Sequence, residues 1–164
     1  MKAASLSDIK KELAEKEVRE LQALCLRLAR YKVENKELLT YLLYEADDEA
    51  GYVSALRSDV NDLFEELPQG NVYFIKKGLR RILRVVNKQL KYSGLPQTEV
   101  EVRMHCCACI LDKRVPLSSS TVLSNMYIQQ LKKIESALSK LPEDLVFDYA
   151  QDFERVKKAK TISK

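Results

Sequence analysis

The sequence has few residues that break or bend a chain. Its 164 residues include only 4 Gly and 4 Pro, the two residue types that most often mark turns. No segment alternates apolar and polar residues for long enough to predict a half-buried strand. Leu, Lys, Glu and Ala together far outnumber the β-branched Val and Thr, which favours helix over sheet. We therefore expect long helices and no β-sheet.

Long apolar runs are also missing. A stretch such as 106–111 is far shorter than the roughly 20 residues that a membrane span needs, and the opening residues lack the apolar core of a secretory signal. Three of the 4 cysteines, Cys106, Cys107 and Cys109, lie in one short segment, which is a poor framework for cross-linking distant parts of a fold. We expect reduced thiols, a cytoplasmic protein and no membrane partner.

Catalytic signatures are absent as well. There is no Gly-x-Ser-x-Gly motif, and Gly70, Gly78 and Gly94 are too isolated to form a phosphate-binding loop. The sequence has one His, and a Cys nucleophile activated by that His is left open. We predict no cofactor and favour a non-enzymatic protein.

One acidic stretch is a candidate for binding a divalent ion. It consists of Glu45, Asp47, Asp48 and Glu49. An EF-hand loop spreads its ligands over twelve residues around a central Gly, and this spacing does not fit. We interpret the stretch as a solvated helix end.

What the sequence does contain is helical periodicity. The clearest helix spans 72–92, begins after a capping Asn71 and ends at Gly94 and Pro96. Its apolar residues form one stripe: Ile75, Leu79, Ile82, Leu83, Val86 and Leu90. This stripe is expected to face the core.

Other helices follow from the same spacing. A first is expected over 8–16 after a cap at Ser5 or Ser7, and a second presents a core face of Val18, Leu21, Leu24, Leu28 and Tyr31. The helical pattern over 34–67 should break within 46–51, and a capping box of Thr98 and Glu101 predicts a helix over 99–113. Two further helices are expected. The core face of the first consists of Leu123, Tyr127, Leu131, Ile134, Leu138 and Leu141, and that of the second, after Pro142, consists of Leu145, Tyr149, Phe153 and Val156.

The expected fold class is all-α, with seven or eight helices in antiparallel hairpins, because short loops permit little else. We expect one helical domain over 1–164, with 1–6 and about 158–164 frayed. A compact bundle and a short helical-repeat, solenoid-like array both fit, since no known repeat signature is present.

The N-terminal quarter contains three short helical segments, at residues 5–13 (SLSDIKKEL), 19–21 (REL) and 34–39 (ENKELL). Together they resemble the start of an uncharacterised family of small helical bacterial proteins. The resemblance implies a bacterial, cytoplasmic, all-helical protein. It brings no activity and no functional residues.

The cysteine segment is the one cluster of soft ligands. On a helix, His105 and Cys109 stand four residues apart and Cys106 and Cys109 three apart, so these three side chains are candidate metal ligands. The alternative, which we favour, is that the segment supplies small core residues, with Cys107 and Ala108 in the apolar register.

The charges are separated along the chain. Residues 45–66 carry eight acids and one base, whereas 67–98 carry seven bases and no acid: Lys76, Lys77, Arg80, Arg81, Arg84, Lys88 and Lys91. These bases could bind a nucleic-acid backbone. In the interpretation that we prefer, the two segments form a hairpin in which Asp62 meets Lys77 and Asp59 meets Arg80.

By exclusion, we expect a non-enzymatic helical interaction or scaffold module that binds a protein partner. The first alternative is a nucleic-acid-binding domain that uses the basic helix 72–92. The second is a metal or thiol protein that uses residues 105–109.

Overall fold

The computed structural model describes residues 2–162, with side chains placed for 2–158. Over this part of the chain it contains eight α-helices, one short 3₁₀ helix and no strand, which confirms the all-α prediction. From the sequence we expect one domain over residues 1–164. In the structure the helices form two compact units, Met1–Glu45 (the N-terminal unit) and Ala46–Lys164 (the C-terminal unit).

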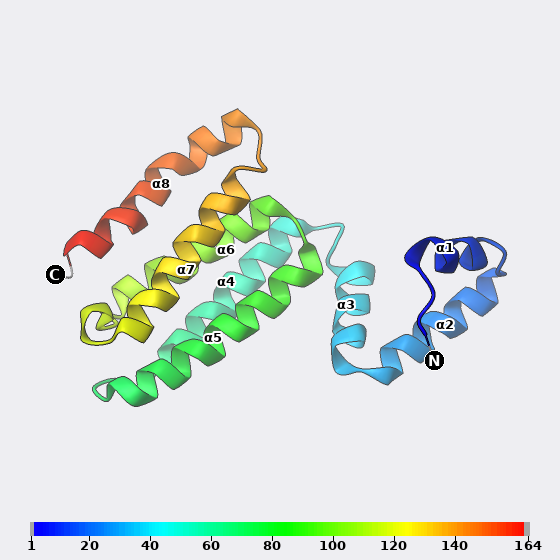
Figure 1. Cartoon of the computed structure of the whole chain (residues 1–164), viewed down its shortest axis with the longest axis horizontal. Helices are drawn as coiled ribbons and strands as arrows, with labels where there is room; N and C mark the ends of the chain where they lie inside the picture. Colours follow the sequence, from blue (N-terminus) through cyan, green and yellow to red (C-terminus); the bar gives the residue numbers. More distant parts are fainter. Residues whose placement is uncertain (1, 163–164) are drawn as a thin grey trace. The chain divides into compact units, whose positions relative to one another are not determined.

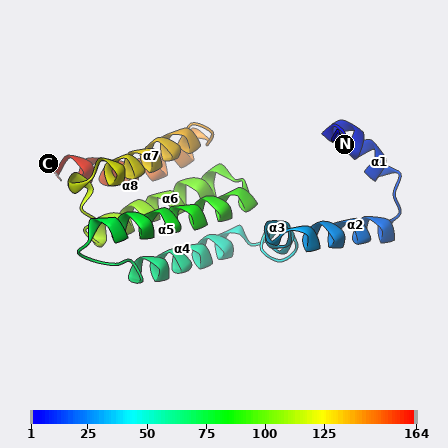
Figure 2. The ribbon, with the colours of Figure 1, turned by 60° about the horizontal axis from the view of Figure 1, so that its bottom comes forward.

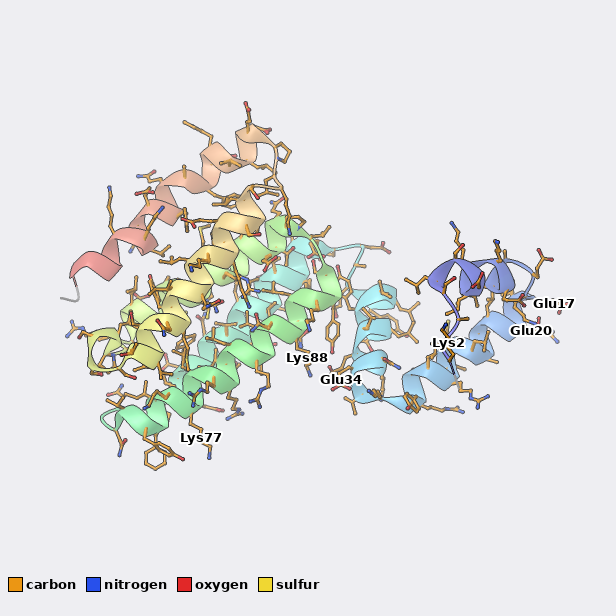
Figure 3. The ribbon with its side chains drawn as sticks, viewed as in Figure 1. Lys2, Glu17, Glu20, Glu34, Lys77 and Lys88 are labelled. Atoms are coloured by element: carbon orange, nitrogen blue, oxygen red, sulfur yellow. The ribbon has the colours of Figure 1, made fainter. Side chains whose placement is uncertain are left out.

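The N-terminal unit holds α1 (Leu6–Ala14), α2 (Val18–Tyr31) and α3 (Val33–Tyr44). Ser5 caps α1, because its hydroxyl accepts the backbone N–H of Asp8 at 3.2 Å. At the start of α2, the Glu20 carboxylate accepts the backbone N–H of Glu17 at 3.0 Å, and Figure 3 shows the two residues there. Helices α2 and α3 pack against each other.

The C-terminal unit holds the remaining helices. They are α4 (Glu49–Glu65), α5 (Val72–Ser93), α6 (Pro96–Asp112), the 3₁₀ helix η1 (Leu117–Ser119), α7 (Thr121–Leu138) and α8 (Glu143–Ile162). The predicted break within 46–51 is confirmed, because α4 begins at Glu49. Gly94 ends α5 in the left-handed conformation, with φ of 67°, which a residue without Cβ adopts most easily.

Helix α6 lies at the centre of this unit. It contacts α4, α5, α7 and α8, and Figures 1 and 2 show it running between α4 on one side and α7 and α8 on the other. Buried side chains therefore occur all around α6, as expected for a helix with neighbours on every side. This arrangement makes the C-terminal unit a compact bundle.

The predicted core stripe of α5 is confirmed, since all six of its residues are buried. The predicted capping box of Thr98 and Glu101 is wrong. Helix α6 begins three residues earlier than expected, with Pro96 in its first turn. The Thr98 hydroxyl donates to Glu49, and Glu101 accepts from Tyr149, so both side chains are engaged by other helices.

Residues 2–5 precede α1, and α8 continues as a helix to Ile162. The expected fraying of 1–6 and about 158–164 stays a prediction. Residues 1 and 163–164 of the predicted frayed ends lie outside the described residues. Among the helices described, none is long and apolar enough to cross a membrane.

Candidate functional sites

A cleft of about 540 Å³ opens between α4, α6 and α8. Three helices supply its charged and polar lining: Arg57 from α4; Glu101, His105 and Asp112 from α6; and Tyr149, Asp152 and Arg155 from α8. Apolar side chains of α6 form part of the same wall. The cleft thus combines ionisable groups with an apolar surface, as ligand sites commonly do.

Three atoms that could serve as metal ligands lie close together beside this cleft. His105 Nε2 lies 2.8 Å from Asn61 Oδ1, the Cys109 thiol lies 3.4 Å from the same oxygen, and Cys109 Sγ lies 3.6 Å from His105 Nε2. His105 and Cys109 are one helical turn apart on α6, and Asn61 comes from the facing α4. A nitrogen, a sulfur and an oxygen therefore converge.

Burial sets the protonation of these side chains. Desolvation, followed by the positive charge of Arg57, lowers the pKa of His105, while a hydrogen bond to the backbone of Arg57 and the negative charge of Asp112 oppose that shift. Desolvation and the charge of Asp112 raise the pKa of the Cys109 thiol. Both shifts favour the neutral forms, imidazole and thiol, whereas an activated Cys nucleophile would need a lowered thiol pKa.

The predicted metal ligands are only partly brought together. His105 and Cys109 meet, but Cys106 is completely buried on another face of α6, and desolvation raises its pKa well above the usual value. Among the described residues, no three His, Cys, Asp or Glu side chains gather where they could hold a metal ion. The core prediction for Cys107 is confirmed, since it is fully buried, whereas Ala108 is only half-buried and lines the cleft.

A second group of polar side chains lies on the cleft rim. The Tyr149 hydroxyl donates to Glu101 Oε1 at 2.5 Å, and Gln97 Nε2 donates to both of these oxygens at 3.1 Å. Desolvation, together with the bond to Glu101, raises the pKa of Tyr149 to about 12. A neighbouring hollow of about 450 Å³ shares Arg57 and Glu101 with the cleft, which extends the polar surface along α4 and α6.

A buried arginine links α6 and α7. Arg103 is only 4% exposed, and its guanidinium donates to Glu99 at 2.8 Å and to Gln130 at 2.7 Å. Lys133 of α7 donates to Asn87 of α5 at 3.1 Å, and desolvation followed by the charge of Arg103 lowers the pKa of Lys133. Each of these polar side chains therefore has a hydrogen-bond partner, as buried polar groups usually do.

The carboxylates of the acidic stretch have different surroundings and do not point to a shared ion. Asp48 caps α4, because its carboxylate accepts the backbone N–H of Gly51 at 3.0 Å. Glu49 accepts the hydroxyl groups of Ser93 and Thr98, which come from α5 and α6. Asp47 and Glu45 are exposed. The prediction of a solvated helix end therefore holds for Glu45, Asp47 and Asp48 but not for Glu49.

The bases of α5 lie opposite its apolar stripe. Lys77, Arg80, Arg81, Arg84 and Lys91 are exposed, whereas Lys76 and Lys88 are half-buried. Figure 3 shows Lys77 and Lys88 on the side of α5 that faces away from α7.

The predicted hairpin of α4 and α5 does form, since the Tyr52 hydroxyl of α4 donates to the Gln89 carbonyl of α5 at 3.0 Å. Its predicted ion pairs are wrong, because within the described residues Asp62 does not pair with Lys77, nor Asp59 with Arg80. Apolar packing sets a register in which Arg81 meets Glu66 at 3.6 Å.

The N-terminal unit exposes most of its apolar side chains. Thirteen of the eighteen large apolar residues that are exposed in the described chain belong to it: Leu6, Ile9, Leu13, Val18, Leu24, Leu26, Leu28, Tyr31, Val33, Leu38, Leu42, Leu43 and Tyr44. The predicted core face of α2 is therefore wrong, because none of its residues is buried. Periodicity identified an apolar face but could not say whether this chain covers it.

Sequence reasoning missed the partners of the cysteine segment. Asn61 and Arg57 are distant from His105 in the chain and approach it because α4 packs against α6, and Tyr149 lines the same cleft because α8 does so as well. The one available signal was that Arg57 and Asn61 are four residues apart, and therefore share a helix face. Nothing in the sequence linked that face to His105.

Comparisons with known proteins leave the family open. No family model, no curated protein and no solved structure matches the chain.

Proposed function

We propose that the protein is a helical interaction module whose N-terminal unit binds the apolar face of a partner protein. The observation that carries the proposal is the apolar surface of α1, α2 and α3, with thirteen exposed large side chains and a single buried residue, Tyr41, among those described. Monomeric soluble proteins rarely leave contiguous apolar patches of more than a few hundred Å² uncovered.

The charges of this unit favour a protein partner over an anionic surface. Residues 1–45 carry nine bases and eight acids, so the unit has almost no net charge with which to attract phosphates or anionic lipids. Bases and acids are interspersed along α1 and α2. An amphipathic helix with a mixed-charge rim is the partner chemistry that such a surface suits.

The first test replaces two exposed apolar residues on different helices, Leu28→Glu and Leu42→Glu together, in the full chain. Leu28 is 60% exposed and Leu42 56%, so we expect little change in circular dichroism or in the melting temperature. Partner capture from lysate by the tagged chain, quantified by mass spectrometry, should lose its specific proteins, and any self-association seen by light scattering should disappear.

A matched control carries Tyr73→Glu and Phe74→Glu on α5. These two aromatic side chains are also exposed, at 64% and 51%, but they lie in the C-terminal unit. The control should retain the same partners as the parent chain. Equal loss in both variants, or capture that neither variant changes, would contradict a role for the N-terminal unit.

A second candidate function is nucleic-acid binding through α5. The specific observation in its favour is that Asp59 and Asp62 do not neutralise the bases of that helix, five of which are exposed. The exposed ring of Tyr73, packed edge-on against Phe74 with centroids 5.4 Å apart, lies near one end of the basic stripe and could stack on a base.

This candidate predicts salt-dependent binding. In a fluorescence titration with a short duplex and a single strand, affinity should fall at least about a hundredfold between about 50 and 200 mM salt. The double variant Arg80→Glu, Arg84→Glu should abolish binding while keeping its helical circular dichroism. Weak binding that is indifferent to these substitutions would leave the N-terminal unit as the only candidate interaction surface.

A further inference from the structure

We propose that His105, Cys109 and Asn61 form a binding site for one zinc ion beside the cleft between α4, α6 and α8. The site is independent of the interaction surface proposed for the N-terminal unit. It differs from the trio expected from the sequence, because Asn61 takes the place of the buried Cys106.

The distances suit one ion. Zinc binds sulfur at about 2.3 Å and nitrogen or oxygen at about 2.0–2.2 Å, so the ligand atoms of a tetrahedral site lie about 3.4–3.6 Å apart. Sγ of Cys109 is already 3.6 Å from His105 Nε2 and 3.4 Å from Asn61 Oδ1. Only the 2.8 Å separation of His105 and Asn61 has to widen, by about 0.6 Å.

The position of the His105 ring also suits a metal ligand. Nε2 faces both of the other atoms, at 2.8 Å from Asn61 Oδ1 and 3.6 Å from Cys109 Sγ. A neutral imidazole that binds an ion through one nitrogen carries its proton on the other, so a zinc ion bound by Nε2 would leave the proton on Nδ1.

The donor set and its surroundings determine which ion fits. Thiolate and imidazole are ligands that zinc prefers, and Asn61 would add a neutral amide oxygen, with a fourth position left for water. Asp112 lies close enough to influence both His105 and Cys109 electrostatically, and its charge favours a cation, whereas the charge of Arg57 opposes one.

Binding is a proton exchange and involves no change of oxidation state. The Cys109 thiol loses its proton to solvent, the resulting thiolate bonds Zn²⁺, and the neutral imidazole gives its lone pair to the same ion. Affinity should therefore fall as the pH is lowered, because protons compete for both ligands.

The test uses the full chain with the exposed Cys25 replaced by Ser, under reducing conditions, so that a surface thiol does not bind metal. Zinc binding is measured by competition with a chromophoric chelator. Co²⁺ is then titrated as a spectroscopic probe, whose thiolate charge-transfer absorption reports a metal–sulfur bond. We expect one equivalent, with His105→Gln and Cys109→Ser each weakening binding by about a hundredfold or more.

Three further variants separate a metal site from a set of hydrogen bonds. Asn61→Asp is nearly isosteric and adds a charged oxygen, so it should tighten zinc binding by about tenfold or more. Arg57→Gln should also tighten it, because a repelling charge is removed. Cys106→Ala should leave the affinity unchanged, since that thiol does not reach the site.

Failure of the proposal has clear signatures. Well under one equivalent of zinc, no thiolate absorption with Co²⁺, or weaker binding in Asn61→Asp would overturn it and leave the three side chains as a hydrogen-bond cluster. None of these outcomes depends on partner binding by the N-terminal unit.

Discussion

Replacing Ile82 by alanine is expected to lower the free energy of unfolding by about 2–5 kcal/mol, because the deletion removes buried apolar atoms and leaves a cavity. Ile82 is only 2% exposed in the middle of α5. Leu131, 7% exposed in α7, should give a loss in the same range. Denaturation by urea or guanidinium, followed by circular dichroism, measures both.

Two alanine variants provide the matched controls. Arg84→Ala changes an exposed residue of the same helix, and Leu26→Ala changes a residue that is 52% exposed in α2. Both should remain within about 0.5 kcal/mol of the parent chain. A melting curve of Ile82→Ala that coincides with the parent's would mean that the core face of α5 is assigned wrongly.

The second large effect is expected at the buried arginine of α6. Glu99→Ala removes the carboxylate that accepts from Arg103 Nε at 2.8 Å, and leaves a buried cation with Gln130 as its remaining partner. Losing one partner of a buried ion pair typically costs about 3–5 kcal/mol. Because the Glu99 side chain is 30% exposed, water compensates in part, and we expect about 2–4 kcal/mol.

A companion variant shows whether the charge itself stabilises the fold. Arg103→Met keeps most of the volume and removes the charge that must be compensated, so it should cost less than Glu99→Ala. Unfolding free energies of both variants and of the double variant form a thermodynamic cycle. If Arg103→Met proved the more damaging change, the ion pair would be a net source of stability and our account of the site would fail.

The local fold could be predicted from the sequence because its signals are short-range. Asn71 and Gly94 are a capping residue and a left-handed terminator, and they bound α5 within one residue of the expected ends. The six-residue apolar stripe of the same helix is buried as its spacing predicts. Few glycines and prolines and no alternating segments already indicated an all-helical protein.

The candidate sites could not be predicted in the same way. Thr98 and Glu101 have the spacing of a capping box, yet they bond Glu49 and Tyr149, because partners from other helices compete with local ones. The donors around His105 meet only where α4 packs on α6. The approach of these side chains depends on the register between the two helices. Apolar packing sets that register, and charge patterns do not.

The sequence by itself determined which residues form helices and which face of each helix is apolar, because both follow from periodicity and capping within a few residues. Only the tertiary structure decided which apolar faces are covered. The stripe of α5 is buried beside α4 and α6, whereas that of α2 stays exposed, although both have the same helical spacing. Burial requires a second surface of matching shape, and the spacing of residues along one helix carries no information about that surface.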